Sequence, residues 1–179
     1  MKDRILLAAR AALVETGTLD MGDVARAAGV GRSSLYRFCG DREGLRELVV
    51  LWMAEVGWAR ALHQARRKRG RAHCLAVVSA YARLVAEDPG MRKAIQTEPD
   101  KMLPLVTDHL RRVQPYVVDQ VEKLLVEHSD DLTLTMPRDQ VAYGVVRLSE
   151  SFVYADALAG REVDLRALDA LVALLLPAS

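Results

Sequence analysis

The sequence predicts an all-α protein, and three observations lead to this prediction. Apolar residues recur at helical spacing through most of the chain, and the period-two alternation that indicates a strand is almost absent. Ala, Leu, Arg and Glu, which favour helices, are abundant, whereas 179 residues include only 6 prolines and 11 glycines. Hydrophobic residues make up 51% of the chain and charged residues 27%, which indicates a folded protein rather than a long disordered tract.

Four helices are predicted before residue 65. The first carries one apolar stripe and ends at Gly17. Asp20 is placed to cap the second helix, because its carboxylate can accept a bond from an unpaired backbone N–H. Gly29 stands where the turn before the third helix needs a left-handed backbone. The predicted ranges are Lys2–Glu15, Met21–Ala28, Arg32–Cys39 and Asp41–Gln64.

A basic segment, Ala65–Ala72 (ARRKRGRA), is predicted to be the hinge between two parts of the chain. Its charges fit a solvated helix end, although a polybasic anchor for lipid or nucleic acid is an alternative. Turns rich in Pro, Gly and Asp separate the helices that follow. Those helices are predicted at Ala72–Glu87, Asp100–Val113, Pro115–Glu127, Arg138–Ala159 and Asp164–Leu176. We predict two domains, residues 1–57 and residues 58–179.

The net charge of +1 hides a division along the chain. Residues 1–72 hold 14 Lys and Arg against 8 Asp and Glu, whereas residues 73–179 hold 11 against 16. A basic part attracts polyanions such as nucleic acid, and an acidic part is repelled by them. The two parts are therefore expected to have different tasks.

Several functional classes find no support in the sequence. The four histidines, His63, His73, His109 and His128, have no partner four residues on, and Cys39 and Cys74 form no C-x-x-C pair. No glycine loop that could cradle a phosphate and no converging catalytic set is present. The chain has no signal peptide and no run of 18 apolar residues. We expect a cytoplasmic protein that is not an enzyme, holds no metal or cofactor, has reduced thiols and does not associate with membranes.

Residues 20–39 carry the pattern of a helix-turn-helix motif. Apolar residues at Val24, Ala25, Ala28, Val30, Leu35 and Phe38 are in register to lock two helices at a steep angle. The outer face of the second helix is then free to enter a major groove. That face presents Gly31, Arg32, Ser33, Ser34, Tyr36 and Arg37. Their side chains can bond to phosphates or base edges, and Gly31 allows close approach of a DNA strand. A polar face that is merely solvated is the alternative.

The segment Asp20–Leu45, DMGDVARAAGVGRSSLYRFCGDREGL, resembles the DNA-binding region of the TetR family of bacterial transcriptional regulators. The resemblance implies that Tyr36 and Arg42 touch the DNA backbone, and that Arg32, Ser33, Ser34 and Arg37 contact bases and phosphates. Three positions depart from the family pattern. Asp20 replaces a threonine, Gly22 replaces a polar or basic residue, and Cys39 replaces a phenylalanine whose place Phe38 is expected to fill.

The resemblance also implies a C-terminal helical domain that binds a small molecule and dimerises through its last two helices. An apolar stripe before residue 156 and the run LRALDALVALLL support a four-helix dimer interface, with packing inside the chain's own core as the alternative. The residues predicted for the interface are Val141, Val145, Leu148, Leu168, Leu171, Val172 and Leu175. The residues predicted to line the ligand pocket are Trp58, Tyr81, Met102, His109, Tyr116, Tyr143, Ser149, Glu150 and Phe152.

The sequence thus predicts a sequence-specific DNA-binding transcriptional regulator. We expect a homodimeric repressor that binds a palindromic operator in double-stranded DNA and is released by a small-molecule effector. A helical module that binds a protein partner without DNA selectivity is one alternative, and an enzyme built on a helical bundle is another. The identity of the effector does not follow from the residues.

Overall fold

The computed structural model describes residues 1–179, with the side chain of Ala157 outside the description, and it confirms the all-α prediction. In the described residues the only extended pairing is an isolated antiparallel bridge between Leu132 and Ala178. None of the described helices is long and apolar enough to cross a membrane. The helices are α1 (Lys2–Thr16), α2 (Met21–Ala28), α3 (Arg32–Cys39), α4 (Arg42–Ala65), α5 (Gly70–Glu87), α6 (Pro89–Thr97), α7 (Pro99–Thr107), α8 (Val113–Glu127), α9 (Arg138–Leu158) and α10 (Leu165–Leu175), with a short 3-10 turn at Ser129–Asp131.

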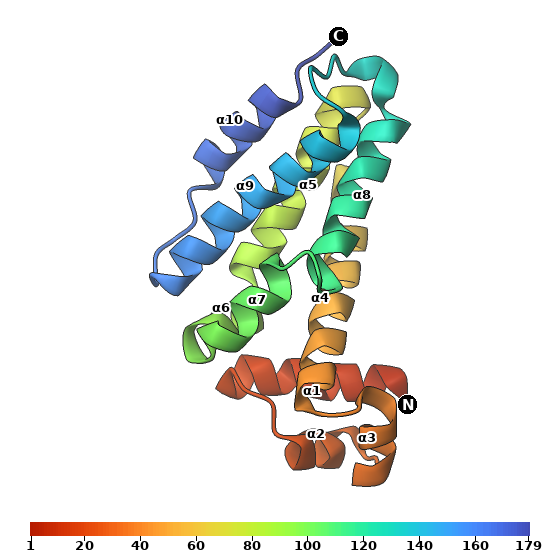
Figure 1. Cartoon of the computed structure of the whole chain (residues 1–179), viewed down its shortest axis with the longest axis vertical. Coiled ribbons are helices and arrows are strands. Elements are labelled where there is room, and N and C mark those ends of the chain that lie inside the picture. The colour runs from red at the N-terminus through yellow and green to blue at the C-terminus, as the bar shows by residue number, and fades with distance from the viewer.

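The molecule is elongated, with α1, α2 and α3 gathered at one end (Figure 1). The long helix α4 leaves that end and runs up beside α5 and α8, while α9 and α10 lie on the opposite side of the bundle from α4 (Figure 1). The short helices α6 and α7 lie between the α1–α3 end and the upper bundle (Figure 1). This arrangement separates a small tip from a larger helical body.

The glycines and the capping aspartate near the N-terminus form the turns that the sequence predicts. Gly17 ends α1 with φ of 75°, and Gly29 ends α2 with φ of 62°, so both adopt the left-handed backbone that glycine tolerates. Asp20 caps α2, because its Oδ1 accepts hydrogen bonds from the N–H groups of Gly22 at 2.8 Å and Asp23 at 2.9 Å. The ranges predicted for the second and third helices match α2 and α3.

The helix boundaries between residues 88 and 113 differ from the prediction. The sequence analysis assigned no helix to residues 88–99, but α6 forms there, because Asp88 caps it and Pro89 occupies its first turn. Asp88 Oδ1 accepts the N–H of Met91 at 2.9 Å. The helix predicted at Asp100–Val113 ends as α7 at Thr107, and α8 begins earlier than predicted, at Val113.

The tip is joined to the body at the junction, which we define as the contact of α1 and α4 with α6 and the start of α7. Arg10 pairs with Asp88 at 2.8 Å, and the buried Arg46 pairs with Glu98 at 2.7 Å. Gly90 allows close approach, since a Cβ there would lie 3.1 Å from Val14. The junction therefore combines close packing with ion pairs.

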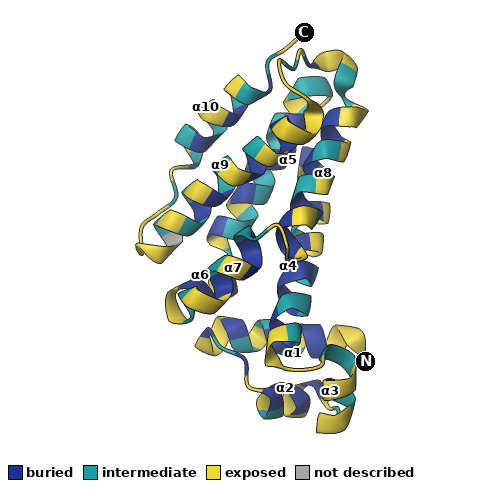
Figure 2. Cartoon of the chain, viewed as in Figure 1, coloured by how far each residue is buried: buried dark blue, intermediate teal, exposed yellow. Residues whose placement is uncertain are grey.

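One core runs through the tip and the body (Figure 2). Helix α4 contributes buried residues along most of its length, from Leu45 to Ala65. The predicted domain boundary at residue 57 falls inside this continuous helix. The division into two domains consequently stays a prediction, and the two parts share one rigid element.

Candidate DNA-binding surface and cavities

The inner side of the α2–α3 unit is packed as the sequence pattern predicts. Val24, Ala25, Ala28 and Leu35 are buried, which holds the two short helices against each other and against α1. Position 44 must be glycine, because a Cβ there would lie 2.0 Å from the carbonyl oxygen of Cys39. This contact sets how closely the start of α4 follows α3.

Phe38 and Cys39 share the place that the resemblance assigned to a phenylalanine. Phe38 is half-buried and packs against the core, as expected. Cys39 is also half-buried, and its Sγ donates a hydrogen bond to the Leu35 carbonyl oxygen at 3.1 Å. Burial is the first cause that raises the pKa of the Cys39 thiol, and Asp41 adds to it. Cys39 is thus a packing residue with a protonated thiol.

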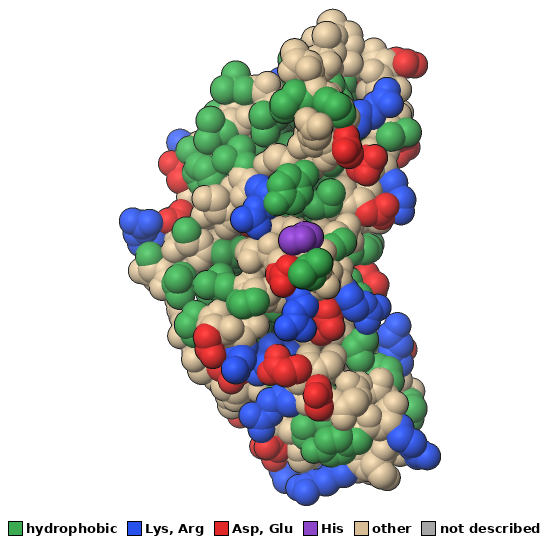
Figure 3. All heavy atoms as spheres, viewed as in Figure 1, with side chains coloured by type: hydrophobic (Ala, Val, Ile, Leu, Met, Phe, Trp, Pro, Cys, Tyr) green, Lys and Arg blue, Asp and Glu red, His purple; other side chains and the backbone are tan. Residues whose placement is uncertain are grey.

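The outer face of α3 is exposed at the tip of the molecule. Arg32, Ser33, Tyr36 and Arg37 are exposed, Ser34 is half-buried, and the tip carries Lys and Arg side chains (Figure 3). Tyr36 keeps 49% of its surface in solvent, so its ring and hydroxyl are accessible to a partner outside the chain. The six residues predicted from the sequence therefore lie together on one accessible surface, and we call this surface the α3 face.

Two arginines beside the α3 face lie close to Asp20. The Arg32 guanidinium occupies space that position 22 leaves open, since a Cβ on Gly22 would lie 2.7 Å from its Nη2. Arg42 lies 4.0 Å from the Asp20 carboxylate. The hydrogen bonds from Asp23 and Gly22 lower the pKa of Asp20, and Arg42 and Arg32 lower it further. The glycine that departs from the family pattern makes room for one of the predicted DNA contacts.

Gly31 is the N-cap residue of α3, a position that glycine suits, and it has no steric reason to be glycine in the free chain. Its φ of −69° suits any residue, and the nearest atoms to a Cβ there are 4.0 Å away. A side chain would project into open space at the N-terminus of α3. The glycine therefore leaves the N-terminus of α3 open to a partner outside the chain.

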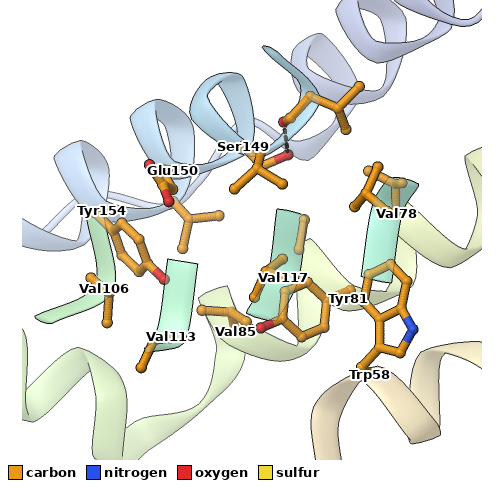
Figure 4. Close-up of a pocket in the computed structure, with 15 residues that line it drawn as sticks. Trp58, Val78, Tyr81, Val85, Val106, Val113, Val117, Ser149, Glu150 and Tyr154 are labelled. Carbon is orange, nitrogen blue, oxygen red and sulfur yellow. Dashed lines mark hydrogen bonds between the residues drawn. The ribbon is translucent and has the colours of Figure 1, made fainter. Parts of the chain in front are cut away.

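The larger body contains a central cavity of about 40 Å³ between α4, α5, α8 and α9. Most of its wall is valine, and the rings of Trp58 and Tyr81 meet edge to face at 5.3 Å (Figure 4). Gly57 leaves room for the Tyr81 ring, because a Cβ there would lie 3.3 Å from Tyr81 Cε2. The polar atoms at the wall come from Tyr81, Tyr154, Ser149 and Glu150.

Part of this wall was predicted from the sequence. Trp58, Tyr81, Ser149 and Glu150 line the central cavity. The other predicted pocket residues lie elsewhere: Met102 is fully buried, Tyr116 and Phe152 are half-buried against the core, and His109 and Tyr143 are exposed. Tyr154 was missed, although its distance of four residues from Glu150 places both on one side of α9. Phe152, two residues from Glu150, turns away from that side.

Glu150 is held by neighbours rather than free to meet a ligand. Gln114 Nε2 donates to its carboxylate at 3.0 and 3.1 Å, and Arg147 donates to it at 2.9 Å. Burial is the largest influence and raises the pKa of the Glu150 carboxyl, while Gln114 and Arg147 act in the opposite direction. The Ser149 hydroxyl donates to the Val145 carbonyl oxygen at 2.8 Å, within its own helix (Figure 4).

The residues predicted for a dimer interface fall into two groups. Val141, Val145, Leu168 and Val172 are buried inside this chain, as the alternative reading of these helices allowed. Leu148 and Leu175 are half-buried, and Leu171 is 40% exposed. Three apolar side chains that were not in the predicted interface, Tyr143, Leu158 and Leu174, are also exposed on α9 and α10. The single chain therefore leaves an apolar outer surface on these helices.

Comparison with known proteins places these features in a family. Residues 69–177 match the model for the C-terminal domain described as tetracyclin repressor-like. No curated protein sequence matches the chain. The chain is 25% identical to the transcriptional repressor QsdR of the TetR family from R. erythropolis, with a TM-score of 0.79 over 98% of this chain and 93% of that chain.

Two further solved structures share the fold. The TetR-family repressor AlkX from Dietzia sp., implicated in biodegradation of n-alkanes, is 19% identical, with a TM-score of 0.68 over 97% of this chain and 91% of that chain. The regulator FadR from Bacillus subtilis, solved in complex with stearoyl-CoA, is 16% identical, with a TM-score of 0.64 over 98% of both chains. The similarity spans the tip and the body together.

Proposed function

Because the chain belongs to the TetR family of transcriptional regulators, we propose that it is a homodimeric repressor that binds a palindromic operator and is released by a small molecule. The members of this family are regulators rather than catalysts, and the same role is proposed here. Since its proposed target is chromosomal DNA, the protein is proposed to act in the cytoplasm.

The α3 face is the observation that carries this proposal. Arg32 and Arg37 can bond to guanine edges or phosphates, and Ser33 and Tyr36 can donate to phosphate oxygens. All four side chains are exposed, on a helix short enough to lie within a major groove. Gly31 at the start of that helix supports the same role, because it leaves the helix N-terminus open to an approaching DNA strand.

A dimer would position two such faces for a palindrome. One short helix makes few base contacts, whereas two held about 34 Å apart match successive turns of the major groove. The exposed apolar side chains of α9 and α10, with Leu171 and Leu174 foremost, support pairing of these helices with those of a second copy. The buried residues of the predicted set would then support this surface from within the chain.

A molecule with a large apolar part is the class of effector best supported. The cavities of the body have mainly apolar walls, and structures with this fold include a complex with stearoyl-CoA. A ligand that prefers one arrangement of the body over another would shift the spacing of the two α3 faces. The affinity for the operator would fall as a result.

Selection of bound DNA from a random pool tests the proposal. We expect recovery of an inverted repeat whose half-sites lie one helical turn apart, bound with strong salt dependence. Arg37→Ala should weaken binding by about 1–3 kcal/mol and relax one base position. Tyr36→Ala should weaken binding to all sequences alike. Arg83→Ala, which removes an exposed arginine of α5 away from the tip, is the matched control.

Failure to recover any selective sequence would overturn the proposal. A stable complex with another protein, formed through the α3 face in place of DNA, would then favour the partner-binding module. Wild-type affinity in Arg37→Ala and Tyr36→Ala together would show instead that another surface reads the DNA.

A further inference from the structure

A second and larger cavity lies next to the central one, where the tip meets the body. It has a volume of about 230 Å³, and we call it the junction cavity. Its wall includes Leu7 and Arg10 of α1, Trp52 and Met53 of α4, and Leu84 of α5. A molecule in this space would touch the DNA-binding end and the helical body at the same time.

Volume decides which of the two spaces can hold an organic molecule. A buried cavity of about 150 Å³ admits a benzene ring, whereas a single water needs roughly 10–15 Å³. The central cavity, at about 40 Å³, therefore has room for only a few waters. The junction cavity, at about 230 Å³, has room for a molecule larger than benzene without any movement of the chain.

The charges at the junction cavity select the kind of molecule. Arg10 and Arg60 both lie in its wall, and Asp88 is the one acid in it. Arg10 pairs with Asp88 at 2.8 Å, whereas Arg60 is exposed and makes no ion pair among the described residues. The rest of the wall is mainly apolar, with Met53 and Leu84 as representative residues. The cavity thus combines an apolar interior with an excess of positive charge.

We propose that the junction cavity binds an anionic amphiphile, with its apolar tail among Met53, Leu84 and their neighbours and its anionic group beside Arg60 and Arg10. Tyr81, Val85 and Tyr154 line both cavities, so the tail points toward the wall that separates them. Figure 4 shows the phenol oxygens of Tyr81 and Tyr154 on the side where Val85 and Val113 lie. A longer tail would continue between these two rings into the central cavity.

Occupancy of this site acts on the contact between α1 and α6. The ligand's anion competes with Asp88 for Arg10, and the Arg10–Asp88 pair ties α1 to the first turn of α6. Loosening that pair frees the tip to change its angle to the body. This consequence rests on the proposed function, whereas the binding of the amphiphile does not.

The two tryptophans of the chain allow the site to be tested directly, because Trp52 lines the junction cavity and Trp58 lines the central one. Decanoate is titrated into the full-length protein, and tryptophan emission is followed together with calorimetry. We expect saturable binding that changes the emission of the Trp58→Phe protein, in which only Trp52 reports. Decanol, which has the same tail without the charge, should bind at least tenfold more weakly.

Variants of the wall test where the anionic group and the apolar tail of decanoate bind. Arg60→Gln should weaken decanoate binding at least fivefold and leave decanol unchanged, whereas Arg67→Gln, an exposed arginine outside the cavity, should change neither. Leu84→Trp should abolish binding by filling the space. Asp88→Asn keeps an oxygen to cap α6 but removes the competing charge, so it should tighten decanoate binding about threefold.

The proposal is overturned by equal affinity for decanol and decanoate or by an unchanged affinity in Arg60→Gln. Loss of binding in Val145→Phe, which fills the central cavity, with no loss in Leu84→Trp would overturn it as well. Folding of each variant is checked by circular dichroism. Operator binding without decanoate is measured in parallel. If the protein binds its operator but not decanoate, the proposed function stands and this site is refuted. If it binds decanoate but no DNA, the site stands and the proposed function is refuted.

Discussion

Replacement of Glu98 by glutamine tests how the tip is attached to the body. Arg46 is only 1% exposed and pairs with Glu98, which is 25% exposed, and with Glu43, which is 54% exposed. Removing one partner of a buried pair costs about 3–5 kcal/mol, because the remaining charge stays desolvated. Glu98 is partly hydrated and a glutamine oxygen can still accept one bond, so we expect Glu98→Gln to cost about 2 kcal/mol.

The expected loss is large enough to measure by urea denaturation followed by circular dichroism. For a chain of this length, 1 kcal/mol corresponds to about 2–4 °C in Tm, so Tm should fall by roughly 4–8 °C. Glu43→Gln removes an exposed partner of the same arginine and should cost less than about 1 kcal/mol. Protein concentration is kept constant because a dimer gains stability with concentration. An equal or smaller loss in Glu98→Gln than in Glu43→Gln would refute the argument from burial.

A second variant distinguishes the net contribution of the ion pair to stability from the cost of leaving one of its charges unpaired. In Arg46→Met with Glu98→Met, no buried charge is left without a partner, and the hydrated Glu43 returns to solvent. Replacement of a buried pair by apolar side chains is often neutral or stabilising. We therefore expect the double variant to be more stable than Glu98→Gln. The opposite order would show that the pair itself stabilises the junction.

Four further predictions concern the DNA face, the cavity and the dimer. Gly31→Ala should cost no more than about 1 kcal/mol in the free energy of unfolding, since alanine is a poorer N-cap than glycine, yet weaken operator binding about tenfold in a gel shift, because the methyl group meets the DNA strand. Asp20→Asn keeps the α2 cap and removes the negative charge beside Arg42 and Arg32, so it should raise affinity for DNA about threefold at low salt and less at high salt. Burial raises the pKa of Glu150, so the carboxyl favours folding at low pH, and this contribution is lost as pH rises through the folded pKa. Glu150→Gln should therefore gain stability relative to wild type in denaturation curves as the pH rises above the usual carboxyl value of 4.5. Leu174→Glu should raise the dimer dissociation constant at least tenfold in sedimentation experiments, and unchanged assembly would exclude the exposed side of α10 from the interface.

Features of the fold that depend on neighbouring residues could be predicted from the sequence. Asp20 and Gly29 act on groups within a few positions of themselves, so the ends of α2 and the start of α3 follow from local rules. Asp88 obeys the same rule, and the cap that it provides for α6 was overlooked because Pro89 and Gly90 indicated a turn. The apolar register of α2 and α3 likewise predicts which side of the motif is buried.

Features that depend on distant contacts could not be predicted in the same way. Arg10 and Asp88 are 78 positions apart, and nothing in either local pattern indicates that they meet. The cavity wall combines valines of α8 and α9, residues that read as ordinary core in a linear sequence. The side of α9 that faces the cavity could have been found from helical spacing, which groups Glu150 with Tyr154 and excludes Phe152. The exposed side chains of α10 are not the same set as the predicted interface. An apolar residue of this helix can be buried inside its own chain or between two chains, and the helical pattern does not distinguish the two.

The continuity of α4 has a mechanical consequence. Its 24 residues span about 36 Å at 1.5 Å per residue, from the turn after α3 to the far end of the body. A tilt on the order of 5° about its upper end would move its lower end by about 3 Å, close to the rise of one base pair. Because a helix bends little when it tilts, a sub-ångström change at the cavity wall would shift the α3 face by about one base pair along the groove. A single uninterrupted helix thus determines how far the tip moves when the body changes its arrangement.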